Sequence, residues 1–192
     1  MAWNLPAGRY DEIRETVAHV VEDYGISIYP FSVFGFIRAL DIRLVPYSKL
    51  PEEDAESLRK SKLDAITVRK SGFDPLKMTI FYDDTVPYER LRFTLSHELG
   101  HIFLEHPGTG EQIYEDEANF FANYLLGPNP LVLRDSFNDA ETIMQDFYVS
   151  YSCARVIQDR TVRRKRLGIP YLDYEWSILE NCRLVRGGVR VA

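Results

Sequence analysis

Residues 91–101 read LRFTLSHELGH, and they contain the most informative pattern in the chain. His97 and His101 are four residues apart, so on an α-helix they lie about 40° apart around the axis and one turn apart along it. Two imidazoles placed in this way can bind one Zn²⁺ at ~2.0–2.1 Å. Glu98 lies about 100° from His97, where its carboxylate can take a proton from a zinc-bound water and pass it to a leaving amine. The segment therefore predicts the metal site and general base of an HExxH metallopeptidase.

The residues around this motif indicate that its helix is buried. Apolar residues occur on nearly every side of the helix, which is typical of a helix inside the protein. Burying two imidazoles and a carboxylate without partners would cost several kcal/mol, and a metal ion would supply a partner. The alternative is a metal-free core in which backbone or carboxylate groups satisfy the histidines. The apolar residues are Leu91, Phe93, Leu95, Leu99, Ile102, Phe103 and Leu104.

A catalytic zinc requires a third protein ligand and one open position. The next predicted helix has an apolar stripe that includes Phe121, and Glu117 lies at the edge of that stripe. An acid that points inward favours a cation as its partner, so we predict Glu117 as the third ligand, with Glu115 as the substitute. In the alternative, Glu117 is a partly exposed first-turn acid that interacts with the helix dipole.

Two residues near the end of the motif helix are predicted to lie outside the ligand set. His106 lies about 180° from His97 on the helical wheel, so we expect a surface or helix-end residue there. Glu105 is on the metal-facing side but two turns along the helix, and we expect it at the rim of the site.

Patterns elsewhere predict an α+β fold: a small antiparallel or mixed sheet packed against a helical bundle that carries the HExxH helix. Residues 1–168 are expected to form a zincin-like domain, with 169–192 as a C-terminal extension that forms a strand or an extended arm. Residues 71–75 are predicted to form a turn, and 50–62 an exposed loop with one short charged helix. Helices are expected near residues 11–24, 32–40, 88–106, 114–126, 139–147 and 150–167, and strands at 43–46, 65–70 and 78–82.

Composition narrows the class of protein. The 192 residues carry a net charge of −6 with 45% hydrophobic residues, which is typical of a globular protein and argues against broad binding to nucleic acid. No apolar run approaches the ~18–20 residues that span a bilayer, and the first residues do not form a secretory signal. Since Cys153 and Cys182 are the only cysteines, no disulfide framework is possible, and we expect a cytoplasmic protein.

Residues 91–101 and residues 116–128, DEANFFANYLLGP, closely resemble the ImmA/IrrE family of metallopeptidases. The family pattern is an R-F-T-x-x-H-E-x-G-H helix followed by an E-A-N-x-F-A-x-x-L-L-x-P helix, and the resemblance extends over residues 87–167. It implies a gluzincin-like zinc peptidase in which His97, His101 and Glu117 bind the metal and Glu98 is the general base. The chain departs from the family at Gly127, where a bulky apolar residue is more common.

The resemblance also implies a substrate. Members of the family are typically cytoplasmic proteases of mobile elements and stress responses that cut a helix-turn-helix repressor. We therefore expect a repressor as the protein partner. The lack of a long apolar run and the negative net charge predict no membrane association and no direct binding of nucleic acid. The strand at residues 78–82 could accept a substrate as an added strand, or it could merely cover the core. Tyr124, Tyr148 or Tyr151 could stabilise the oxyanion.

Two rival functions remain open. Residues 149–157 resemble the start of a helix-turn-helix, and the basic cluster that follows would suit a DNA-binding module. The alternative is that the cluster is a basic helix face exposed to solvent. A protein that binds a metal and sequesters a repressor without cutting it is the other rival. The basic cluster consists of Arg160, Arg163, Arg164, Lys165 and Arg166.

Overall fold

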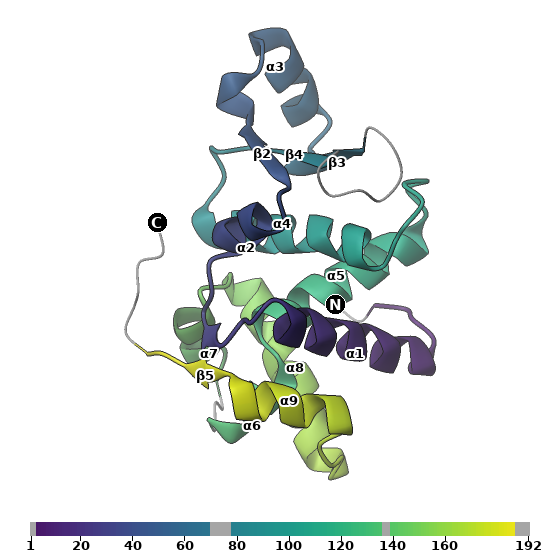
Figure 1. The fold of residues 1–192 in the computed structure, drawn as a ribbon, viewed down its shortest axis with the longest axis vertical. Helices are drawn as coiled ribbons and strands as arrows, with labels where there is room; N and C mark the ends of the chain where they lie inside the picture. Colours follow the sequence, from purple (N-terminus) through teal and green to yellow (C-terminus); the bar gives the residue numbers. More distant parts are fainter. Residues whose placement is uncertain (1–2, 70–77, 136–138, 187–192) are drawn as a thin grey trace.

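The computed structural model describes residues 3–69, 78–135 and 139–186 (Figure 1). Within these residues, none of the helices combines the length and the apolar character that crossing a bilayer requires. The helices are α1 (Ala7–Asp23), α2 (Val33–Ala39), η1 (Tyr47–Lys49, a 3-10 helix), α3 (Glu52–Lys60), α4 (Tyr88–Phe103), α5 (Gln112–Leu126), α6 (Asn129–Arg134), α7 (Ala140–Phe147), α8 (Tyr151–Leu167) and α9 (Asp173–Asn181). The strands are β1 (Ile28–Tyr29), β2 (Arg43–Pro46), β3 (Ala65–Arg69), β4 (Met78–Tyr82) and β5 (Arg183–Leu184).

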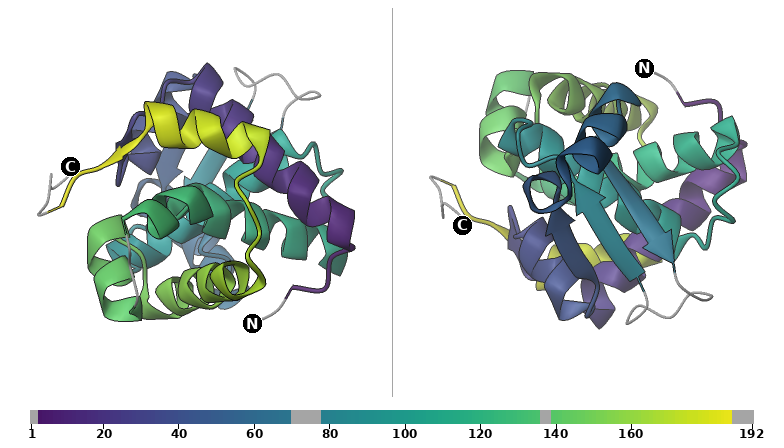
Figure 2. Two further views of the ribbon diagram at one scale, coloured as in Figure 1. Left: turned by 90° about the horizontal axis from the view of Figure 1, so that it is seen from below. Right: turned by 90° about the horizontal axis from the view of Figure 1, so that it is seen from above.

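The fold is α+β, as the sequence predicts, and its main sheet is mixed. The three strands are in the order β2-β4-β3, with β2 parallel and β3 antiparallel to β4. The sheet lies between α3 on one side and α4 on the other (Figure 1), and the view from above shows α3 in front of the strands (Figure 2, right). Helix α2 lies beside α4, and α1 and α5–α9 form a bundle on the other side of α4, so α4 is enclosed between the sheet and the bundle.

The order of strands corrects one expectation. β4 is the central strand, so residues 78–82 do not offer an edge to which a substrate could add. Among the described residues, β3 pairs with β4 on one side only, and Thr67 of β3 forms a hydrogen bond with Glu98 of the HExxH motif. The turn predicted at residues 71–75, and Lys70 before it, lie outside the described residues.

Helix α4 ends earlier than its apolar pattern predicts. The last helical residue is Phe103, and Glu105 adopts a left-handed backbone conformation with φ of 55°. The amide of His106 then donates to the carbonyl of His101 over 3.0 Å, which turns the chain back toward the helix. This turn reverses the direction that the helical wheel gave for His106: its side chain is buried and only 2% exposed. The expectation of a surface residue at this position was wrong.

Helices α4 and α5 pack closely because both carry a small residue at their contact. A Cβ added at Gly100 would lie 3.0 Å from the Cα of Ala118 and 3.1 Å from its carbonyl oxygen. Helix α5 also contacts α1 and α8, and it is buried on more sides than its stripe suggests, since Asn123 is only 1% exposed. At Gly127, Ile157 of α8 fills the space that a larger residue would occupy.

The C-terminal region belongs to the helical bundle up to the last described residue. Helix α9 packs across α1 (Figure 2, left), and β5 pairs in parallel with β1. The sequence predicted a strand or an extended arm here, and it missed α9, α6 and the short β1. The buried carboxylate of Glu175 on α9 forms hydrogen bonds with Arg164 on α8 and Tyr124 on α5, so α9 is tied to the core.

Candidate metal centre

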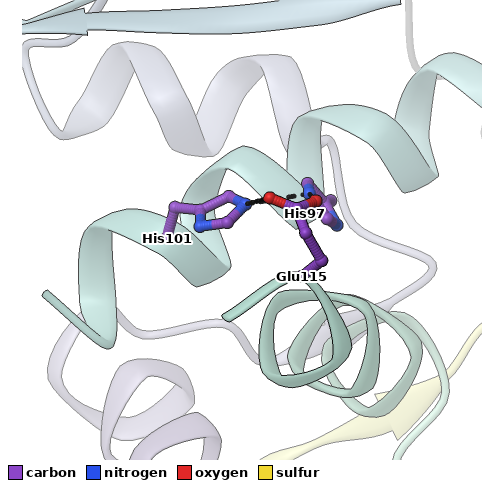
Figure 3. Close-up of side chains that lie close together, drawn as sticks. All are labelled: His97, His101 and Glu115. Carbon is purple, nitrogen blue, oxygen red and sulfur yellow. Dashed lines mark hydrogen bonds and ion pairs between the residues drawn. The ribbon is translucent and has the colours of Figure 1, made fainter. Parts of the chain in front are cut away.

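Helices α4 and α5 bring three ligand groups together. His97 and His101 project from α4, and Glu115 extends from the first turn of α5 to lie between them (Figure 3). The carboxylate oxygens of Glu115 lie 3.3 Å from Nε2 of His97 and 3.5 Å from Nε2 of His101. The two Nε2 atoms are 2.9 Å apart. One ligand atom from each residue lies within 4.8 Å of the others.

This donor set fits a zinc ion. Two imidazole nitrogens and one carboxylate leave one open position of a tetrahedral site. The histidine side chains are 16% and 18% exposed and that of Glu115 is 39% exposed, so a solute can reach the group. Burial, aided by the neighbouring His97, lowers the pKa of His101 to about 4. A neutral imidazole has a free lone pair, which a metal ligand requires.

The other ring nitrogen of each histidine is held by a neighbour. Nδ1 of His97 lies 3.1 Å from Oδ1 of Asn119, one turn after Glu115 on α5. Because an amide oxygen only accepts, Nδ1 of His97 carries the hydrogen and Nε2 keeps its lone pair. Nδ1 of His101 lies 2.9 Å from Nδ1 of His106. Such outer hydrogen bonds orient metal-binding histidines.

The structure does not bring Glu117 into the ligand group. Its carboxylate accepts hydrogen bonds from Arg9 over 2.8 and 2.6 Å and lies 2.9 Å from Nε2 of His106. Although burial opposes it, hydrogen bonds from Arg9 and His106 keep the pKa of Glu117 below its usual value. Glu117 does point inward with a cation as its partner, as the sequence predicts, but that cation is Arg9.

Glu98 lies beside the group on the face of α4 that meets the sheet. It is 8% exposed and accepts a hydrogen bond of 2.5 Å from the hydroxyl of Thr67 on β3. Burial raises the pKa of Glu98 above its usual value, against the opposing effect of Thr67. A carboxylate with a raised pKa is better able to hold a proton between two steps of a reaction near neutral pH.

A cleft of about 640 Å³ opens onto these residues. Residues of β3, α4, the start of α5 and the connection at 107–110 line it. Of the described tyrosines, Tyr114 lines the cleft, and the three proposed as oxyanion donors do not. Tyr124 is fully buried and donates to Glu175. Glu105, expected at the rim, is exposed and does not line the cleft.

Four residues around the site were missed by sequence reasoning: Arg9, Thr67, His106 and Asn119. Asn119 follows Glu115 by four residues, a separation that puts both on one face of the helix. That spacing was a usable signal. The sequence has no local signal for Arg9 or Thr67, because both reach the site from elements distant in the chain.

Two histidines one turn apart, an acid from the adjoining helix and a buried carboxylate beside them define an HExxH-type site. The chain belongs to peptidase family M78: the family model, described as the IrrE N-terminal-like domain, matches residues 52–156. The resemblance noted in the sequence is thereby confirmed, and membership supports a peptidase, a hydrolase that acts on peptide bonds. No curated protein has significant sequence similarity to the chain.

Proposed function

We propose that this protein is a zinc-dependent endopeptidase in which His97, His101 and Glu115 hold the metal and Glu98 is the general base. The main support for this proposal is the position of the Glu115 carboxylate, which lies 3.3 and 3.5 Å from the Nε2 atoms of the two histidines. It assigns the third ligand to Glu115 in place of Glu117, whose carboxylate is engaged by Arg9 and His106.

Bound zinc would lower the pKa of a water molecule and polarise the scissile carbonyl. Glu98 accepts the proton of the attacking water and delivers it to the nitrogen of the leaving amine. Its raised pKa suits the second half of this task, since a weaker acid holds the proton until the amine departs. Thr67 restrains the carboxylate through its hydrogen bond.

We propose that the substrate backbone lies along β3. This strand borders the cleft with Ala65, Ile66, Thr67 and Arg69, and an extended peptide can add to the unpaired side of an edge strand. By resemblance to the ImmA/IrrE family, the substrate is a helix-turn-helix repressor. Both cysteines are free thiols in the structure, which is consistent with the proposed cytoplasmic location.

The basic cluster offers little support for a DNA-binding function. Arg160 donates to Asn123 and to the carbonyl of Gly127, so its guanidinium forms hydrogen bonds inside the protein. Arg164 is buried against Glu175. Arg163, Lys165 and Arg166 remain exposed, which fits a solvated helix face.

The test compares the wild-type chain with Glu98→Gln. Each zinc-loaded protein is incubated with a purified helix-turn-helix repressor, with and without a chelator, and fragments are identified by mass spectrometry. We expect Glu98→Gln to bind zinc with wild-type stoichiometry and to cleave about 10²–10⁴-fold more slowly. Glu105→Gln, which changes an exposed acid at the end of α4, is the control and should cleave at the wild-type rate. Undiminished cleavage by Glu98→Gln would exclude Glu98 as the base.

A further inference from the structure

A chain of hydrogen bonds links the first turn of α1 to the metal centre. Arg9 donates through Nε and Nη2 to the two oxygens of Glu117 over 2.8 and 2.6 Å. Glu117 lies 2.9 Å from Nε2 of His106, and Nδ1 of His106 lies 2.9 Å from Nδ1 of His101. Arg9 lies outside residues 52–156, which the family model matches.

The direction of each hydrogen bond follows from the chemistry of the groups. An ionised carboxylate only accepts, so Nε2 of His106 must carry a hydrogen and donate it to Glu117. In a neutral imidazole, Nδ1 of His106 then has a lone pair, and it accepts a hydrogen from Nδ1 of His101. His101 is left with its lone pair on Nε2, the atom that faces His97 and Glu115.

Arg9 is needed because Glu117 is buried. The Glu117 side chain is 8% exposed, and an uncompensated carboxylate at such a position is costly. The planar guanidinium matches the two carboxylate oxygens and fixes their orientation. A carboxylate held in this way presents Oε2 to His106 in one geometry.

We propose that Arg9 is a positioning residue of the metal centre, which acts through Glu117 and His106 to keep Nε2 of His101 directed at the metal. This inference rests on the proposed zinc site. It makes α1 a functional part of the peptidase, although α1 precedes the matched family domain.

The first test measures zinc affinity by competition with a chromophoric chelator. We expect Arg9→Met and Glu117→Gln each to weaken zinc binding about 10–100-fold, the range found when a partner of a metal-binding histidine is lost. Arg9→Lys keeps the charge but not the paired hydrogen bonds, so we expect an intermediate loss. Glu12→Gln is the matched control: Glu12 is a second partner of Arg9, and its loss leaves the bonds to Glu117 intact, so affinity should stay within about twofold of wild type.

The second test needs no substitution. The chain has only four histidines, so ¹⁵N NMR of the zinc-loaded wild type can assign each ring hydrogen. We expect His106 to carry its hydrogen on Nε2 and His101 on Nδ1. A hydrogen on Nδ1 of His106 would reverse the chain of donors and overturn the inference.

The outcomes separate this inference from the proposed function. If the wild type binds no zinc, the proposed metal centre fails, and the inference fails with it. If the wild type binds zinc and all Arg9 variants bind it equally well, the metal centre stands and only the inference is overturned. An Arg9 variant that does not fold, judged by its far-UV circular dichroism, is left out of the comparison. The zinc affinity of Glu117→Gln and the NMR result then test the inference.

Discussion

At the scale of single residues, Glu115 and Glu117 of α5 have different partners. Glu115 and Glu117 are two positions apart, about 200° around the helix, so they cannot reach the same point. Glu115 faces the pair of Nε2 atoms on α4, and hydrogen bonding to His97, the largest effect, lowers its pKa. Glu117 faces His106 and Arg9. In the proposed metal site, Glu115 completes the ligand set and Glu117 forms a hydrogen bond with His106 behind it.

The ligand assignment predicts a clear difference between variants of α5. Glu115→Gln removes a charged ligand and should weaken zinc binding by more than the ~10–100-fold expected from losing an outer partner. Asp116→Asn, the control, changes an acid that bonds Gln112 and Asn4 outside the site, and its zinc affinity should equal that of the wild type. Affinity is measured by chelator competition. Wild-type binding by Glu115→Gln, together with complete loss in Glu117→Gln, would restore Glu117 as the third ligand.

At the scale of elements, the site depends on how closely α4 and α5 approach. The proposed ligands come from two helices, so the distance between Glu115 and the histidines follows the separation of the helix axes. Gly100 permits this separation because its missing Cβ leaves room for the backbone of Ala118. Since the space is bounded by backbone atoms, a larger residue cannot be accommodated by moving one side chain.

Gly100→Ala should therefore destabilise the protein although alanine favours helix. The added Cβ would meet Ala118 at 3.0–3.3 Å, and overpacking of this kind costs about 1–3 kcal/mol. The free energy of unfolding in urea is the measurement. Gly8→Ala on α1 is the matched control, because nothing lies within 4 Å of its added Cβ, and it should raise stability by about 0.4–1 kcal/mol. Equal stabilisation by both substitutions would show that the helix contact is looser than described.

At the scale of the whole molecule, segments far from the catalytic helices hold the bundle together. Glu175 on α9 is fully buried and bonds Arg164 on α8 and Tyr124 on α5. Helix α9 also packs against α1, which carries Arg9. The region expected as a C-terminal extension thus supports both the core and the helix that reaches the metal centre.

Glu175→Gln should destabilise the whole chain. The substitution leaves the buried guanidinium of Arg164 without its counter-charge, and breaking a buried pair in this way costs about 3–5 kcal/mol. Urea unfolding followed by circular dichroism measures the loss. Glu180→Gln on the same helix changes an exposed acid and should alter stability by less than about 0.5 kcal/mol. A Glu175→Gln protein as stable as the wild type would show that the pair does not hold α9.

Local sequence patterns were sufficient to predict the helices and strands that have a clear hydrophobic period. The HExxH helix, the helix that follows it, and strands β2 and β4 were predicted from periodicity and turn residues. Their order predicted a small sheet, antiparallel or mixed, beside a bundle, and the structure shows that it is mixed. Helix α9 was missed because the tail offers no clear period. The direction of the His106 side chain was predicted wrongly because the helical wheel assumes a continuous helix. The left-handed backbone of Glu105 interrupts the helix just before His106.

The sequence alone determined that His97, Glu98 and His101 lie on one helix at spacings suited to a metal and a base, because those relations depend only on helical geometry. It also narrowed the third ligand to two acids at the start of the next helix. Only the tertiary structure shows that the carboxylate of Glu115, and not that of Glu117, lies beside the two histidines. The carboxylate of Glu117 is engaged by Arg9 of α1 and by His106, and the long-range contact with Arg9 is set by the packing of the core.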